Sequence, residues 1–217
     1  SSKLILNKMN KLNYSDLLTL LNKQIDNHST SRYFIALSGA PGSGKSTVSE
    51  KLVSDLNTVG HKSSILQMDA FHYDDQILKE KNLLLKKGAP ETFDVMGLLN
   101  FINRLEKESE VVIPVFDRSL ELSRSSAVII SDDIKVVIFE GNYLLLKSHP
   151  WRELHKFFNS TIMVNCDEKI LEERLIKRWE NFNLSKEIIN QKVYENDLPN
   201  GVYVLKNSIS PDFELSN

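Results

Sequence analysis

A glycine-rich loop in the first quarter of the chain constrains the fold more than any other segment. It consists of Gly39, Ala40, Pro41, Gly42, Ser43, Gly44, Lys45, Ser46 and Thr47. This is the P-loop pattern, in which Gly and four variable residues precede Gly, Lys and Ser or Thr. An apolar run at 33–37 comes before the loop, and a helical stretch at 46–59 follows it until Gly60. We therefore expect a buried strand, the loop and a helix in succession.

The loop predicts a site for a nucleoside triphosphate. Glycines let successive backbone N–H groups point inward at an anion, and the following helix directs its positive end to the same place. Lys45 then supplies a positive charge to the outer phosphates, and the Ser46 hydroxyl is a ligand for Mg²⁺. We assign residues 39–47 to nucleotide binding. A guanine-specific site needs an Asn-Lys-x-Asp segment, and 22–25 fails at its fourth position, so we expect ATP by elimination.

Apolar runs alternate with helical patterns along the rest of the chain. Strands are expected at 33–37, 63–68, 111–115, 127–130, 136–139, 161–164 and 202–205. Helices are expected at 15–27 with Ser15 as N-cap, and at 46–59, 95–107, 168–181 and 185–195. This alternation predicts an α/β protein, a three-layer P-loop NTPase fold with a mainly parallel sheet and a helical lid. The length predicts one domain over 1–217, with 1–28 as an N-terminal helical extension packed on it.

Composition argues against several classes of protein. The formal net charge is -2 and no block is rich in lysine or arginine, so we expect no nucleic-acid partner. No apolar run reaches about 18 residues, so no membrane span is expected. The single cysteine, Cys166, cannot form an internal disulfide and fits a reducing cytoplasm, where we expect the protein to act. The oligomeric state stays open, with a homodimer as one arrangement.

Two carboxylates directly follow predicted strands. Asp69 comes after 63–68, and Glu140 comes after 136–139. Ligands of parallel sheets bind beyond the carboxyl ends of the strands, so both side chains are expected beside the P-loop. Phosphoryl transfer to an alcohol needs a carboxylate that accepts the hydroxyl proton and a metal that bridges the phosphates. We interpret Asp69 as the general base, which also contacts the metal or its water, and Glu140 as a Mg²⁺ carboxylate. The alternative is that each caps the next segment.

Two arginines on the predicted helix 168–181 suit the developing charge of phosphoryl transfer. Arg174 and Arg178 are four residues apart and share a helix face, while a neighbouring apolar stripe should face the protein. The helix is interpreted as a lid whose guanidinium groups reach across the phosphates. The alternative is an ordinary solvated helix face.

The acceptor side has weaker candidates. Asp117 and Arg118 follow the predicted strand 111–115 and either grip a polar acceptor or form a local salt bridge. His72 either contacts substrate or has a structural role. The loop 87–94 contains glycine and proline and is expected to form a shaped wall, and 199–201 is a candidate wall for adenine.

Together these residues resemble the phosphoribulokinase, uridine kinase and bacterial pantothenate kinase group of P-loop kinases. The resemblance runs from residue 33 to the end of the sequence and includes 39–47, 69–71, 90–94, 114–117 and 140–141. It implies an ATP:alcohol phosphotransferase with Mg²⁺, with Asp69 as base, Glu140 at the metal and arginines 174 and 178 on the lid. Segments 87–94 and 196–200 are most similar to a branch provisionally named fructose transport system kinase or uridine kinase-like protein.

The chain departs from uridine kinases at the acceptor loop. Gly88 and Ala89 stand where those enzymes carry Asp-His, and Phe116 replaces the tyrosine of their Tyr-Asp pair. Uridine is therefore not the expected acceptor. The predicted function is transfer of the γ-phosphate of ATP to a hydroxyl of a sugar-, vitamin- or nucleoside-like metabolite. The alternative is a P-loop NTPase that acts as a nucleotide-dependent regulator or partner-binding module.

Overall fold

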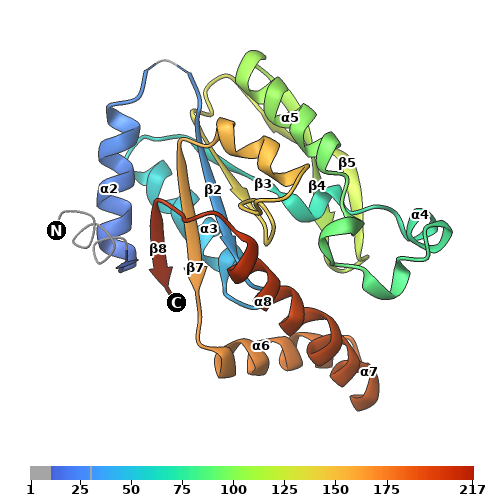
Figure 1. The fold of residues 1–217 in the computed structure, drawn as a ribbon. Helices are drawn as coiled ribbons and strands as arrows, with labels where there is room; N and C mark the ends of the chain where they lie inside the picture. The colour runs from blue at the N-terminus through green and yellow to red at the C-terminus, as the bar shows by residue number, and fades with distance from the viewer. Residues whose placement is uncertain (1–10, 30) are drawn as a thin grey trace.

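A parallel sheet at the centre of the molecule organises the other elements (Figure 1). The computed structural model describes residues 11–29 and 31–217. The sheet contains β1 (Lys11–Leu12), β2 (Tyr33–Gly39), β3 (Ser63–Gln67), β6 (Val136–Glu140), β7 (Ser160–Asn165) and β8 (Phe213–Ser216). Its strand order is β1-β8-β7-β2-β6-β3, and every neighbouring pair is parallel. The P-loop strand β2 is therefore central and buried along its whole length.

Two apolar clusters on opposite faces of the sheet create three layers. On one face, α2 (Tyr14–Asp26) and α3 (Lys45–Thr58) pack their leucines against the strands. The other face carries α5 (Val95–Lys107) and the 3-10 segment η4 (Trp151–Phe157). A hairpin of β4 (Val111–Asp117) and β5 (Leu122–Ile130) joins this second cluster. The predicted α/β class with a mainly parallel sheet is confirmed.

A helical lid lies beyond the carboxyl ends of the strands (Figure 1). It consists of α6 (Glu168–Glu180), α7 (Lys186–Asn190), the π-helix η5 (Gln191–Asp197) and α8 (Leu198–Asn207). A small apolar cluster centred on Leu175, Ile189 and Val193 holds these elements together. The sequence predicted this lid, although it did not predict the π-helical turn.

Two details of the sequence prediction are wrong, and one pair of expected strands lies outside the central sheet. The expected strand 202–205 lies inside α8, where Gly201 and Val204 are buried one helical turn apart, so the apolar run follows helical rather than strand periodicity. The strand that follows α8 is instead β8, which lies between β7 and β1 in the sheet. The expected strands 111–115 and 127–130 form, but as an antiparallel hairpin outside the central sheet. Asn13, and not Ser15, caps α2 by accepting a hydrogen bond from the backbone N–H of Asp16.

The expected N-terminal extension is described only in part, because residues 1–10 lie outside the described residues. From residue 11 onward, β1 pairs with β8 and α2 packs on the sheet through Leu17, Leu21 and Ile25. No helix among the residues that the structure describes is long and apolar enough to cross a membrane.

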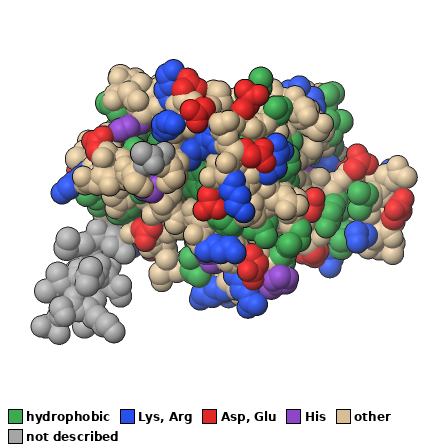
Figure 2. Space-filling view, turned by 90° about the horizontal axis from the view of Figure 1, so that it is seen from above, with side chains coloured by type: hydrophobic (Ala, Val, Ile, Leu, Met, Phe, Trp, Pro, Cys, Tyr) green, Lys and Arg blue, Asp and Glu red, His purple; other side chains and the backbone are tan. Residues whose placement is uncertain are grey.

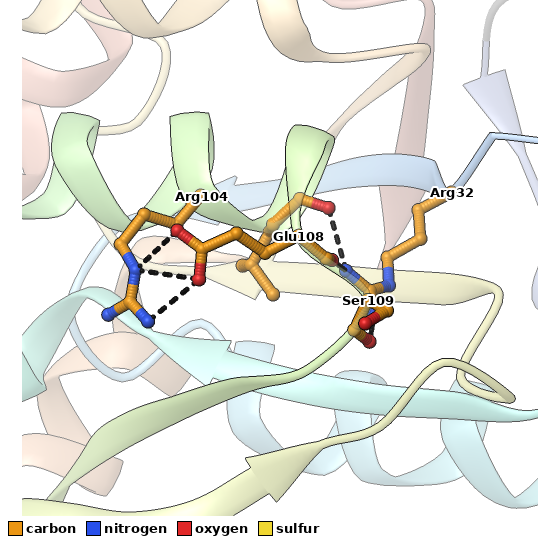
Figure 3. A network of polar contacts seen from close by, with 5 residues as sticks. Arg32, Arg104, Glu108 and Ser109 are labelled. Carbon is orange, nitrogen blue, oxygen red and sulfur yellow. Dashed lines mark hydrogen bonds and ion pairs between the residues drawn. The ribbon is translucent and has the colours of Figure 1, made fainter.

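One arginine joins the elements at the amino ends of the strands. Arg32 lies just before β2, and its guanidinium donates five hydrogen bonds to backbone carbonyls, with donor–acceptor distances of 2.5–3.1 Å. The acceptors belong to Leu105, Glu108, Ser109, Ser131 and Ile134. Figure 3 shows the guanidinium beyond the last turn of α5. A cation at a helix C-terminus satisfies carbonyls that have no helical partner.

The molecular face around these amino ends carries both signs of charge. Figure 2 views it from above and shows acidic and basic side chains interspersed over much of the surface. Pairs such as Lys62 with Asp133 and Arg104 with Glu108 contribute to this mixture.

We expect Arg32→Ala to lower the free energy of unfolding by about 2–3 kcal/mol, because several carbonyls lose a charged donor at once. Denaturant unfolding followed by circular dichroism would measure this. Arg104→Ala is the matched control, since Arg104 is an exposed neighbour that bonds only Glu108 in the same network (Figure 3). Equal unfolding midpoints for Arg32→Ala and the wild type would contradict the structural role assigned to Arg32.

Candidate active site

The P-loop connects the central strand β2 to the first turn of α3. Gly42 and Gly44 have φ of 80° and 89°, in the left-handed region that side chains disfavour. A Cβ on Gly39 would lie 2.6 Å from Ser43 Oγ and 2.8 Å from the carbonyl oxygen of Val164. The loop therefore requires glycine for both its backbone path and its close packing.

The interior of the loop suits an anion. The Ser43 hydroxyl oxygen is buried and forms no hydrogen bond with any residue that the structure describes. Buried hydroxyls without partners are rare in folded proteins, and a phosphate oxygen is a suitable partner. The residues present thus fit a bound triphosphate. Ser46 lies half-buried at the start of α3, and Thr47 is exposed.

Lys45 folds back over the loop. Its ammonium group is buried and donates to the carbonyl oxygen of Ala40 at 3.1 Å. Burial lowers the pKa of Lys45, while the negative charges of Glu140 and Asp69 oppose that effect. A buried ammonium with one carbonyl partner is incompletely satisfied, so an anionic ligand can replace that contact.

Glu140 ends β6 next to this lysine. The side chain is buried, and burial raises the pKa of its carboxyl group, against the opposing effects of the Lys45 charge and the Ser46 hydroxyl. In the sheet register Glu140 lies opposite Leu37 of β2 and Gln67 of β3. The parallel sheet therefore brings the predicted metal carboxylate beside the P-loop, next to the hydroxyl of Ser46, the other predicted metal ligand.

Asp69 lies in the short 3-10 helix η1 (Met68–Phe71), immediately after β3. Its carboxylate accepts a long 3.4 Å contact from Arg118 Nη2. Its charge influences the pKa of both Lys45 and Glu140, which places it in the same electrostatic cluster. The geometry thus groups Asp69 with Lys45 and Glu140, while its role as base and the role of Glu140 at a metal stay predictions.

His72 and Phe116 form the wall next to Asp69. The Nδ1 atom of His72 lies 2.9 Å from the carbonyl oxygen of Asp69, and its ring packs against Phe93 and Phe116 with centroids 4.0 and 5.2 Å away. Burial lowers the pKa of His72, although the nearby Asp69 opposes this. Of the acceptor-side candidates, His72 and Arg118 therefore meet at Asp69.

Asp117 is engaged elsewhere. Its carboxylate accepts hydrogen bonds from Ser119 and Leu120 in the hairpin turn, and pairs with Arg124 at 3.2 Å. Of the two alternatives for Asp117 and Arg118, the local salt bridge between them does not form, because Asp117 pairs with Arg124 and Arg118 with Asp69.

The lid helix α6 lies against the P-loop. Arg174 Nη1 donates to the carbonyl oxygen of Gly42 at 3.2 Å and approaches Cys166 Sγ at 3.5 Å. Leu175 is fully buried and lies against Gly42. The guanidinium of Arg178 lies 5.3 Å from the ring of Trp179, and its charge lowers the pKa of Lys45. Both arginines thus lie close to the phosphate loop.

Sequence reasoning missed several residues of the site. Asn217 Nδ2 donates to the carbonyl oxygen of Ser43 at 2.9 Å, next to Gly44. Tyr143 is fully buried and donates to the carbonyl oxygen of Gly88 at 2.5 Å. Neither belongs to a motif. Tyr143 lies only three residues after Glu140, so a search of the residues that follow predicted strands could have found it.

A cavity of about 710 Å³ lies between the loop 87–94, the start of α5 and α8. Ala89, Pro90, Pro199 and Asn200 are among its lining residues, so the loop predicted to form a wall does line a cavity. Gly201 is packed on the other side, where a Cβ would lie 3.0 Å from Ala40 Cβ. The start of α8 therefore lies between this cavity and the P-loop.

Comparison with known proteins places this geometry in a family. Residues 35–195 match the AAA domain family. A Schizosaccharomyces pombe protein provisionally named uridine kinase C227.14 is 29% identical over 194 residues, which cover 85% of this chain and 83% of that protein. The pantothenate kinase of Ligilactobacillus salivarius is 30% identical over 151 residues, covering 68% of this chain and 49% of the relative. The chain thus spans about half the length of that pantothenate kinase.

A solved structure agrees over nearly the whole chain. The crystal structure of a protein from Silicibacter sp. TM1040, provisionally described as a fructose transport system kinase, superposes with a TM-score of 0.88. It is 33% identical in sequence, and the match covers 95% of this chain and 99% of that chain.

Acid should destabilise the protein through His72. Its pKa is below the ordinary 6.5 in the folded state, so its contribution to stability is complete above pH 6.5 and is lost as the pH falls through the lowered folded-state pKa. We therefore expect the free energy of unfolding to decrease from pH 7 to pH 5 less steeply in His72→Gln than in the wild type. His149→Gln, at an exposed position, is the control. Parallel pH profiles for His72→Gln and the wild type would refute this.

Proposed function

This chain belongs to the AAA domain family, and its relatives include proteins named as uridine and pantothenate kinases. On that premise we propose that it transfers the γ-phosphate of ATP to a hydroxyl group of a small metabolite. The observation that carries the proposal is the grouping of Lys45, Glu140 and Asp69 at the carboxyl ends of β2, β6 and β3. A nucleotide-binding module that lacks an acceptor needs no carboxylate such as Asp69 to accept a hydroxyl proton.

The residues divide into three roles in this proposal. Residues 39–47 hold the triphosphate through backbone N–H groups and the Lys45 ammonium. Ser46 and Glu140 would hold Mg²⁺, which when bound offsets charge on the phosphates. Asp69 orients the acceptor hydroxyl and accepts its proton. Arg174 and Arg178 face the loop from the lid and stabilise charge on the transferring group.

The acceptor side supports a polar metabolite smaller than a macromolecule. Arg118 reaches Asp69 from the hairpin, and His72 lies on the same wall between Phe93 and Phe116. When an acceptor hydroxyl donates a hydrogen bond to the carboxylate of Asp69, the guanidinium of Arg118 can bind another polar group of the same molecule. Gly88 and Ala89 lack the side chains by which a uridine kinase-like loop would hold a nucleoside, so we favour a sugar- or vitamin-like acceptor.

A screen for ADP release tests the activity. Purified protein with ATP and Mg²⁺ is expected to release ADP slowly alone and much faster with one compound from a panel of sugars, nucleosides and pantothenate. The second candidate, a nucleotide-dependent regulator, predicts instead that no metabolite accelerates turnover and that ATP changes association with a protein partner. That combined result would end the kinase proposal.

Asp69→Asn should remove most turnover and leave ATP binding nearly unchanged. A positioned base contributes roughly 10²–10⁴-fold to the rate, and the amide cannot take the proton. Turnover with the best acceptor and the Kd for ATP, from calorimetry, give the two readouts. Asp117→Asn is the control, because Asp117 is a nearby carboxylate that serves the hairpin turn. Equal loss of turnover and of ATP binding in Asp69→Asn would remove Asp69 from the role of base.

A further inference from the structure

The segment 196–200, which the P-loop mechanism does not use, lies where a π-helix becomes α8. The π-helix η5 follows α7, and both belong to the lid (Figure 1). π-helical turns are rare and often occur at functional sites, because the extra residue in the turn re-aims its side chains. Here two consecutive residues, Asn196 and Asp197, contact two different parts of the molecule.

Asp197 contacts the lid helix. Its carboxylate accepts a 2.6 Å hydrogen bond from Trp179 Nε1, and its side chain is buried. Lys192 Nζ lies 4.3 Å from the centroid of the Trp179 ring. Burial raises the pKa of Asp197, while the Trp179 bond and the charges of Arg178 and Lys192 act in the opposite direction. Asp197 is therefore a buried acid near two cationic side chains, and it bonds Trp179, the residue that follows the lid arginine Arg178.

A buried carboxylate of this kind is unfavourable if its role is packing alone. Burying an acid costs free energy that a single neutral hydrogen bond does not fully offset, and an apolar residue would fill the space without that penalty. Asp197 also begins α8 without capping it, since its side chain forms no cap hydrogen bond there. The side chain is directed to Trp179 instead, next to Arg178.

Asn196 contacts the acceptor-side loop. Its Nδ2 donates to the carbonyl oxygen of Lys87 at 3.2 Å, and its Oδ1 accepts from Asn200 at 3.1 Å. The next residue of that loop, Gly88, is held from the sheet side by the hydroxyl of Tyr143. The segment 196–200 therefore joins the lid to the loop 87–94 through adjacent residues.

We propose that Asp197 is a positioning residue that fixes α6 so that its arginines face the phosphate loop. We also propose that Asn196 couples the lid to the acceptor loop through its hydrogen bond to the carbonyl oxygen of Lys87. The role rests on the proposed kinase function. Asp197 acts through Trp179 and Arg178 and need not touch either substrate. Binding of the acceptor against the loop and placement of the lid arginines are then linked through two consecutive residues.

Replacement of the charge tests this role. Asp197→Asn keeps an oxygen for Trp179 and nearly the same volume, so the fold should survive. Because small misplacements of catalytic groups reduce rates strongly, we expect kcat to fall roughly 10- to 100-fold while the Kd for ATP changes less than about twofold. The KM for the acceptor should rise in Asn196→Ala, with less effect on kcat.

Tyr194→Phe is the matched control. The hydroxyl of Tyr194 bonds Glu172, so it joins the same two elements, η5 and α6, at an exposed position. We expect this variant to keep wild-type kcat. Wild-type kcat in Asp197→Asn, or an equal loss of kcat in Asp197→Asn and Tyr194→Phe, would overturn the proposal.

A second readout separates this proposal from the proposed function. The emission of Trp179, obtained by difference from Trp179→Phe, should change on addition of a non-hydrolysable ATP analogue in the wild type and in Tyr194→Phe. In Asp197→Asn, the change in Trp179 emission on addition of the analogue should differ from that of the wild type. If no acceptor is found, this readout and the slow ATP hydrolysis rate still decide the role of Asp197. An identical emission change in Asp197→Asn and the wild type would overturn it.

Discussion

The burial of Lys45 next to Glu140 is the constraint on which the rest of the site depends. Two ionisable groups are removed from water at the carboxyl ends of neighbouring strands, and each partly offsets the desolvation of the other. The pair exists because β2 and β6 are adjacent and parallel, and because glycines give the loop a turn over which the Lys45 side chain folds back. The neighbouring strand β3 then delivers Asp69 to the same edge.

The sequence predicted those parts of the structure whose cause is local. The P-loop, the strand-end acids and the lid arginines each follow from a motif or from the end of an apolar run, and the structure brings these residues together. Features of the structure that depend on tertiary packing were not predicted. The run 202–205 is apolar in either a strand or a helix, and only packing of Gly201 on Ala40 and burial of Val204 decide for the helix.

The lid shows why the remaining site residues escaped prediction. Asp197 and Trp179 are eighteen positions apart and meet at the end of the π-helix η5, where it packs on α6. Asp117 looked like an acceptor ligand because it follows a strand, yet that strand is in a hairpin, where a turn aspartate bonds the backbone ahead of it. The rule that strand-end residues gather at one edge applies to the parallel sheet, where Asp69 and Glu140 come together, and does not apply to the antiparallel hairpin.

The most direct test of this account is a crystal structure with Mg²⁺ and a non-hydrolysable ATP analogue. The account predicts the triphosphate in the loop 39–47, the metal at Ser46 on the side of Glu140, and the terminal phosphate facing Asp69 beneath the lid arginines. A terminal phosphate directed away from Asp69, with the metal held by neither Ser46 nor Glu140, would contradict it.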